Sequence, residues 1–169
     1  MTSFDPRRKV MSWDRAREWR QTVRGRLVFT NGVFDLLHPG HVDVLRGARA
    51  CGDALVVGVN SDASVRRLKV PSRPIRAEQD RLYVLAALEV VDAVVLFEED
   101  TPLELVRAIE PDVIAKGGDY TQDSIVGAAE VRARGGEVVV IPLTPGHSTT
   151  TTIDRIESQE PHAARRPPV

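Results

Sequence analysis

The sequence has a single cysteine, few aromatic residues, almost no net charge and no long apolar run. Cys51 has no partner for an internal disulfide, so we expect a cytoplasmic protein. A net charge of -1 and an aromatic content of 5% argue against broad binding to nucleic acid or to anionic membranes. No apolar run approaches the roughly 20 residues that a membrane-spanning helix needs. We therefore expect neither nucleic acid nor membrane as a partner.

The composition is that of an ordinary globular domain. The chain has 169 residues, of which 42% are hydrophobic and 28% charged, and this is long enough to bury a core. There is no internal repeat and no long linker between apolar segments. We therefore expect one main domain.

Short, valine-rich apolar runs alternate with segments of helical periodicity. The apolar runs predict strands at 27–30, 54–59, 93–97, 113–116 and 137–141. The segments between them predict helices at 41–51, 77–90, 101–109 and 124–134. Thr101-Pro-Leu-Glu104 has the N-cap, the first-turn proline and the capping-box glutamate of a helix start. This order predicts an α/β fold, a single doubly wound Rossmann-like domain with a five-stranded parallel sheet.

The two ends differ from this pattern. Residues 12–23 predict a helix that places Trp13, Ala16, Arg20 and Val23 on one stripe, which would pack on the domain or on a second subunit of a homodimer. We therefore expect a helical extension over 1–25 and the main domain over 26–156. The tail over 157–169 has little to bury, and we expect it to be disordered.

Two histidines, His38 and His41, lie between the first predicted strand and the first predicted helix. The first N–H groups of a helix lack internal partners and its dipole favours anions, so such a junction binds phosphate well. Gly40, between the histidines, would let a ligand approach the backbone. A metal-binding pair is one alternative, although no convincing third ligand follows, and a surface turn is another. The position after the first strand favours phosphate.

Two further motifs follow later strands. Ser148-Thr-Thr-Thr-Thr152 has more hydroxyl groups than one helix cap uses, so these groups either cap a helix or bind phosphate oxygens. In Lys116-Gly-Gly-Asp-Tyr120, two glycines allow a ligand to approach the backbone, Lys116 is a cation and Asp119 can accept from a ribose or a base. The alternative is a tight turn held by a Lys–Asp pair.

Cations between the second and third predicted strands could converge on the edge of the sheet where these motifs lie. Lys69 and Arg73 belong to a stretch that prolines stiffen, with a solvated loop as the alternative interpretation. Arg81 is near a predicted helix start, where a cation is unfavourable for the dipole. An anionic ligand or a carboxylate partner would explain its position.

Together these motifs resemble those of the nucleotidyltransferase superfamily. Thr30 to His41 is similar to its H-x-G-H signature, and Ser148-Thr-Thr150 resembles its second, C-terminal motif. Further segments narrow the resemblance to adenylyltransferases that activate D-glycero-β-D-manno-heptose 1-phosphate: Asn-Ser-Asp62, Arg-Leu-Lys69, Ser-Arg-Pro74, Phe-Glu-Glu-Asp-Thr-Pro102 and Lys-Gly-Gly-Asp-Tyr120. The resemblance runs from about residue 27 to 156. Many bacteria fuse this domain to a sugar kinase, and since no kinase-sized segment is present we expect the stand-alone form.

The resemblance implies transfer of AMP from ATP to a sugar 1-phosphate, giving ADP-heptose and pyrophosphate, with Mg²⁺ delivered by ATP and no protein metal ligands. It implies catalytic roles for His38, His41 and Lys69. The implied nucleotide-binding residues are Thr30, Asn31, Gly32, Phe34, Gly40, Lys116, Gly118, Asp119, Ser148, Thr149 and Thr150. The implied sugar-phosphate ligands are Asp35, Arg73 and Arg81. His147 has no assigned role.

Two rival functions stay open. A cytidylyltransferase acting on glycerol 3-phosphate or another polyol phosphate would share both signature motifs. A nucleotide-binding regulator could keep the fold without turnover.

Overall fold

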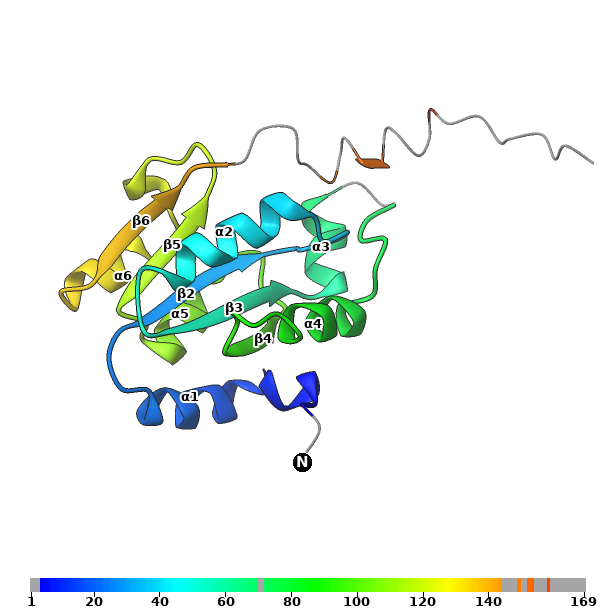
Figure 1. The fold of residues 1–169 in the computed structure, drawn as a ribbon. Helices are drawn as coiled ribbons and strands as arrows, with labels where there is room; N and C mark the ends of the chain where they lie inside the picture. Colours follow the sequence, from blue (N-terminus) through cyan, green and yellow to red (C-terminus); the bar gives the residue numbers. More distant parts are fainter. Residues whose placement is uncertain (1–3, 70–71, 144–148, 150–151, 154–157, 159–169) are drawn as a thin grey trace, which may run out of the picture.

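The computed structural model describes residues 4–69, 72–143, 149, 152–153 and 158 (Figure 1). Its centre is one sheet whose paired strands are all parallel, in the order β1-β4-β3-β2-β5-β6. The strands are β1 (Val10–Met11), β2 (Leu27–Gly32), β3 (Ala54–Asn60), β4 (Ala93–Phe97), β5 (Val113–Gly117) and β6 (Glu137–Ile141). The helices are η1 (Pro6–Lys9), α1 (Trp13–Thr22), α2 (Pro39–Arg49), α3 (Asp62–Leu68), α4 (Glu78–Ala86), α5 (Leu103–Ile109), η2 (Gln122–Ser124) and α6 (Ala128–Ala133).

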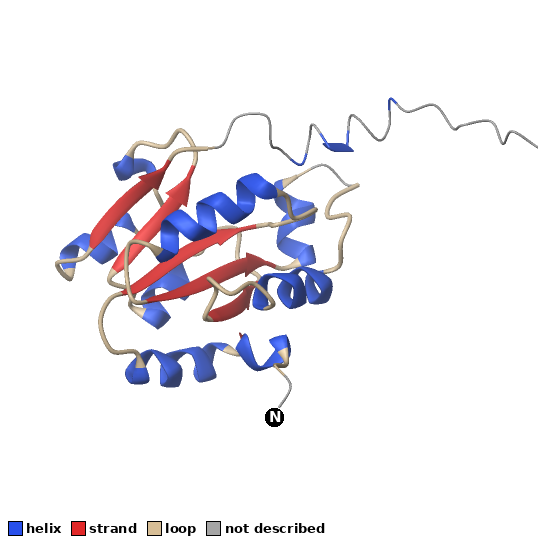
Figure 2. Ribbon diagram, viewed as in Figure 1, coloured by secondary structure: helices blue, strands red, loops and turns tan. Residues whose placement is uncertain are grey.

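Helices cover both faces of the sheet (Figure 2). Successive strand residues point to opposite faces, so Val28 joins one apolar cluster and Phe29 the other. The Phe29 cluster includes residues of α1, α5 and α6, whereas the Val28 cluster includes residues of α2 and α4. Burial on both faces explains why these strands are continuous apolar runs, and it confirms the predicted parallel α/β fold.

The prediction of five strands was wrong, because the sheet has six. The additional strand, β1, pairs with β4 through Val10 opposite Val94 and Met11 opposite Val95. It lies inside the segment that we predicted as a helical extension. A two-residue strand is too short for any periodic pattern, so only its pairing partner identifies it.

The N-terminal helix α1 packs on this chain's own sheet, which was one of the two predicted alternatives. The Trp13 indole N–H donates to the Leu96 carbonyl at 2.8 Å. Trp13, Trp19 and Val23 pack against the buried cluster that contains Ala16. The homodimer remains a prediction. The predicted tail lies outside the described residues except for Ser158.

Helix α3 was not predicted, since no helix or strand was expected between the strand at 54–59 and the helix at 77–90. Ser61 caps its start, with the hydroxyl oxygen accepting from the Ser64 N–H at 3.1 Å, and Ser64 and Val65 are buried. Seven residues with one buried apolar side chain give little helical periodicity. Ser61, a residue type typical of helix N-caps, was the feature of the sequence that could have predicted this helix.

Other helix boundaries differ from the prediction for local reasons. Helix α6 begins at Ala128 and not at 124, because Gly127 has a left-handed φ of +88° that ends the preceding turn. Helix α4 ends at Ala86 and not at Val90, and Lys9 donates to the Leu88 carbonyl just beyond. Helix α5 has Pro102 as its N-cap with no side-chain cap, so the predicted Thr101 capping box was wrong.

The order of the strands creates a crevice at the centre of the sheet. From β2 the chain adds β3 and then β4 on one side, and afterwards crosses to place β5 and β6 on the other. The carboxyl ends of β2 and β5 therefore flank the point where the winding reverses, which is where ligands bind in doubly wound sheets. Among the residues described, no helix has the length and apolarity to cross a membrane.

Candidate functional site

A cavity of about 430 Å³ opens at the carboxyl ends of β2 and β5. Most of the residues that the sequence singled out meet there, although they come from five separate segments. Its lining includes Thr30, Asn31, Gly32, Phe34, Asp35, His38, Gly40, His41, Lys69, Arg73, Lys116 and Thr149. Side chains up to 119 positions apart in the sequence thus face one space.

The loop between β2 and α2 forms the floor of this cavity in a strained conformation. Phe34 and Leu36 have φ values of 52° and 53°, in the left-handed region that residues with a Cβ rarely adopt. Each such residue costs on the order of 1 kcal/mol, so surrounding contacts must hold the loop.

Asp35 supplies one of these contacts. Its side chain is fully buried, and it accepts from Arg73 Nε at 2.7 Å, from the Ile75 N–H at 2.9 Å and from the Arg76 N–H at 2.9 Å. Burial acts to raise the pKa of Asp35, but the two backbone N–H groups and the Arg73 guanidinium outweigh it and leave the pKa below its ordinary value. The carboxylate is therefore ionised and joins this loop to residues 73–76. The roles of Asp35 and Arg73 toward a sugar phosphate remain predictions.

The two histidines lie at the start of α2, where Pro39 occupies the first turn and His38 is the N-cap. Their rings stack with centroids 3.8 Å apart and planes 25° apart, and the Phe34 ring lies 5.4 Å from His41. Burial, followed by the nearby His38, lowers the pKa of His41 to about 4, against an opposing effect of Asp35. His41 is therefore neutral at pH 7. Within the described part of the chain its buried Nδ1 has no hydrogen-bond partner.

Lys116 crosses from the end of β5 to the end of β2. Its ammonium group donates to the backbone carbonyl of Asn31 at 3.0 Å and to the Asn31 side-chain oxygen at 2.9 Å. Burial lowers the pKa of Lys116 to about 8. At neutral pH it is a cation in a largely dry position, where it would interact strongly with an anion.

Gly118 and Asp119, the last two residues of the predicted Lys-Gly-Gly-Asp segment, lie beyond the cavity wall. Gly118 has a φ of +134°, and a Cβ built on it would lie 2.8 Å from the Tyr120 ring. Its N–H donates to the Ile141 carbonyl at 3.1 Å, which ties this segment to β6. Neither Gly118 nor the exposed Asp119 belongs to the lining of the cavity, and their nucleotide-binding roles remain predictions.

The hydroxyl motif reaches the site through Thr149. Its hydroxyl donates to the Asp35 carbonyl at 3.0 Å, so it contacts the strained loop directly. Ser148 and Thr150 lie outside the described residues.

Several lining residues were missed by the sequence interpretation: Val33, Val44, Tyr120 and Leu143. Gly117, one of the two glycines expected to let a ligand approach, does line the cavity. Tyr120 and Leu143 are 48% and 54% exposed and offer apolar surface beside Lys116, which suits a flat aromatic ligand. Tyr120 was within the motif, so its aromatic type was an available signal. Leu143 follows β6, and only the pairing of β6 with β5 brings it close.

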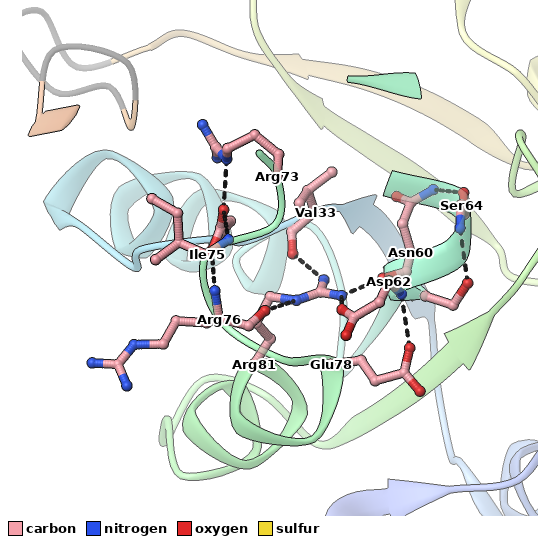
Figure 3. Close-up of polar contacts among 11 residues, drawn as sticks. Val33, Asn60, Asp62, Ser64, Arg73, Ile75, Arg76, Glu78 and Arg81 are labelled. Carbon is pink, nitrogen blue, oxygen red and sulfur yellow. Dashed lines mark hydrogen bonds and ion pairs between the residues drawn. The ribbon is translucent and has the colours of Figure 1, made fainter. Parts of the chain in front are cut away.

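Arg81 does not line this cavity. Its side chain is buried, and one of its nitrogens lies 2.8 Å from a carboxylate oxygen of Asp62 (Figure 3). This is the carboxylate partner that we considered for a cation at a helix start. Arg81 instead borders a second cavity of about 560 Å³, which shares Phe34 and His38 with the first.

No group of three or more His, Cys, Asp or Glu side chains within the described ranges is arranged to hold a metal ion. The donors of the main cavity are instead imidazoles, two ammonium groups, a guanidinium and hydroxyl groups. This donor set suits phosphate oxygens, which are anionic and accept hydrogen bonds.

Comparison with known proteins agrees with this chemistry. The family model described as cytidylyltransferase-like matches residues 29–155. The bifunctional protein HldE of Methylobacillus flagellatus is 58% identical over 144 residues, covering 85% of this chain and 29% of that protein. HldE of Hyphomonas neptunium is 61% identical over 130 residues, covering 77% and 27%. The chain thus spans less than a third of these curated relatives.

A solved structure is also similar. The lipopolysaccharide core biosynthesis protein from Thermoplasma volcanium is 31% identical, with a TM-score of 0.59. The match covers 72% of this chain and 98% of that one. It therefore includes nearly the whole of a solved structure.

Proposed function

Because the chain belongs to the cytidylyltransferase-like family, we propose that it transfers AMP from ATP to a heptose 1-phosphate, giving ADP-heptose and pyrophosphate. Family membership makes it a nucleotidyltransferase. ATP and the heptose are our proposals, supported by the similarity to HldE proteins and by the residues of the cavity. A cytoplasmic location is also a proposal, which rests on the single cysteine.

One observation carries the proposal: the stacked histidine pair at the start of α2, in which His41 is neutral at pH 7, faces cations from two other segments. His41, in the first turn of α2, lines one part of the cavity and Lys116 another. Lys69 and Arg73 line it from the segment between α3 and α4. Such a site brings two anions together and stabilises the charge that develops between them. It contains what transfer to a phosphate requires.

In the proposed reaction an oxygen of the sugar phosphate attacks the α-phosphorus of ATP. A new P–O bond forms, the bond between the α-phosphorus and the bridging oxygen breaks, and pyrophosphate leaves with that electron pair. The nucleophile is already ionised at neutral pH, so no general base is needed and positioning supplies most of the rate.

We assign roles from the position of each group. Lys69 and Arg73 would neutralise the incoming sugar phosphate, and His38 and His41 would donate to oxygens of the triphosphate. Lys116 would interact with a phosphate of ATP, and the walls made by Tyr120 and Leu143 would hold its nucleoside. Mg²⁺ would arrive on the phosphates, because the described side chains do not form a carboxylate cage for it.

The test is pyrophosphate release with Mg²⁺ and heptose 1-phosphate, with ATP, CTP, GTP and UTP offered separately. Turnover with ATP alone supports the proposal. Turnover with CTP and glycerol 3-phosphate, without turnover on ATP, would replace it by the cytidylyltransferase alternative. Nucleotide binding without release for every sugar phosphate would indicate a regulator.

The Lys116 cation predicts a pH dependence of nucleotide binding. Its ammonium is charged below its pKa of about 8 and loses its proton above it. We therefore expect the Kd for ATP to rise about fivefold between roughly pH 7 and pH 9. Calorimetric titration across this range measures it.

Lys116→Met should bind ATP about tenfold more weakly at pH 7 and show little further change up to pH 9. Lys9→Met is the control, because Lys9 donates to the Leu88 carbonyl away from the cavity. A wild-type pH profile in Lys116→Met would remove Lys116 from the nucleotide site.

A further inference from the structure

Arg81 is 3% exposed, and three of its nitrogens donate to four different residues (Figure 3). Its Nε donates to the Arg76 carbonyl at 3.1 Å and its Nη1 to the Val33 carbonyl. Its Nη2 donates to the Asn60 carbonyl and to the Asp62 carboxylate, both at 2.8 Å. One side chain thus connects segments that follow β2 and β3 with the one that precedes α4.

These hydrogen bonds and those of Asp35 join the same two segments of the chain. The backbone of Arg76 is held on both sides of its Cα, since its N–H donates to Asp35 at 2.9 Å while its carbonyl accepts from Arg81. Arg81 also holds Val33, two residues before Asp35. The strained loop at 33–37 and the segment at 72–77 are therefore fixed to each other twice, once through Asp35 and once through Arg81.

The segment that carries Lys69 and Arg73 is also fixed at its N-terminal end, next to α3. Arg81 Nη2 holds Asp62 in the first turn of α3, and the Asp62 N–H donates to the Glu78 carboxylate at 2.7 Å. Lys69 is the C-cap of α3, so its place depends on this helix. Both cations that face the cavity from this side, Lys69 and Arg73, lie between points that Arg81 fixes.

We propose that Arg81 is a positioning residue, which holds Lys69 and Arg73 against the β2–α2 loop so that they meet the sugar phosphate. This inference rests on the proposed function and replaces the predicted contact of Arg81 with substrate. Its guanidinium suits the task, because a rigid fork of five donors can satisfy four acceptors that a lysine ammonium cannot reach together.

The test is Arg81→Lys, assayed per folded molecule well below its unfolding temperature. We expect kcat/KM for the sugar phosphate to fall roughly 30-fold, since a misplacement of about 1 Å can cost 100-fold. The Kd for ATP should rise less, by about threefold, because Lys116 on β5 does not contact Arg81 and only the β2–α2 loop is shared between the two effects. A merely structural role would lower the folded fraction and leave both constants of the folded enzyme unchanged.

Arg20→Lys is the matched control. Arg20 also donates to a carboxylate, that of Asp112, and to a carbonyl, that of Glu110, but at the opposite end of the sheet. We expect its kcat/KM to stay within about twofold of wild type. An equal loss in both variants would overturn the proposal. If Arg81→Lys does not fold, Asp62→Ala removes one of the four acceptors and should lower kcat/KM about threefold.

Amide hydrogen exchange gives a readout that needs no turnover. In Arg81→Lys, peptides covering 33–37 and 72–77 should exchange faster, while peptides of β5 and β6 keep wild-type rates. Unchanged exchange at 33–37 and 72–77 would overturn the inference. If the wild-type protein releases no pyrophosphate, the proposed function fails, and the exchange result still decides whether Arg81 holds these segments.

Discussion

His41→Ala is expected to lower kcat for pyrophosphate release by about 100-fold or more, which corresponds to roughly 2.7 kcal/mol of transition-state stabilisation. The half-buried, neutral imidazole lies at the N-terminus of α2, stacked on His38. There it would donate to phosphate oxygens whose charge grows during transfer, in a position shielded from water. Steady-state rates with ATP and heptose 1-phosphate measure the effect.

Two variants make this result specific to the imidazole. His41→Gln keeps a hydrogen-bond donor and should recover part of the rate, whereas Val42→Ala, its neighbour in the same helical turn, should stay within about threefold of wild type. A wild-type kcat in folded His41→Ala would exclude the catalytic role.

Asp35→Asn is expected to lower the free energy of unfolding by about 3 kcal/mol, because breaking a buried ion pair leaves its partners unsatisfied. The fully buried carboxylate accepts from Arg73, from the Ile75 N–H and from the Arg76 N–H. An amide can place only one oxygen among these donors and brings two N–H groups of its own. Urea denaturation at pH 7 measures the loss.

The sign of the pH dependence follows from the lowered pKa of Asp35. The stability that it contributes is present above the pKa of the unfolded state, about 3.9, and is lost as the pH falls through the lower, folded pKa. Asp35→Asn should therefore show a flatter decline in stability below about pH 4. Asp14→Asn is the control, since Asp14 is exposed and pairs with Arg17 on the surface, and it should change stability by less than about 0.5 kcal/mol. A comparable loss in both variants would contradict the special role of Asp35.

Most of the fold could be predicted from the sequence. Two strands, at 93–97 and 137–141, have the predicted bounds, and the other long strands differ by one or two residues. Burial on both faces of a parallel sheet makes such runs continuously apolar, and this signal is local. The misses, β1 and α3, are elements of two and seven residues whose existence depends on a partner or a cap.

The sequence predicted which residues lie at the site more completely than it predicted what each of them does. His38, His41, Lys69 and Lys116 meet around one cavity, as their positions after strands indicated. Arg81 has a carboxylate partner and three carbonyl partners, none of which is close to it in a periodic pattern. Its contacts span up to 48 positions, so no local spacing could reveal them.

The sequence by itself determined the alternation of strands and helices, the placement of the histidines at a helix start and the clustering of cations after strands, because each depends on neighbours within a few residues. Only the tertiary structure decided which groups face the cavity and which hold others in place. Asp35, Arg73 and Arg81 are all charged residues near the same loop. The Asp35 side chain is fully buried, Arg73 borders the cavity, and Arg81 donates hydrogen bonds to three segments. The physical reason is that burial and hydrogen bonding, which set the role of a charge, arise from chain segments brought together only when the sheet forms.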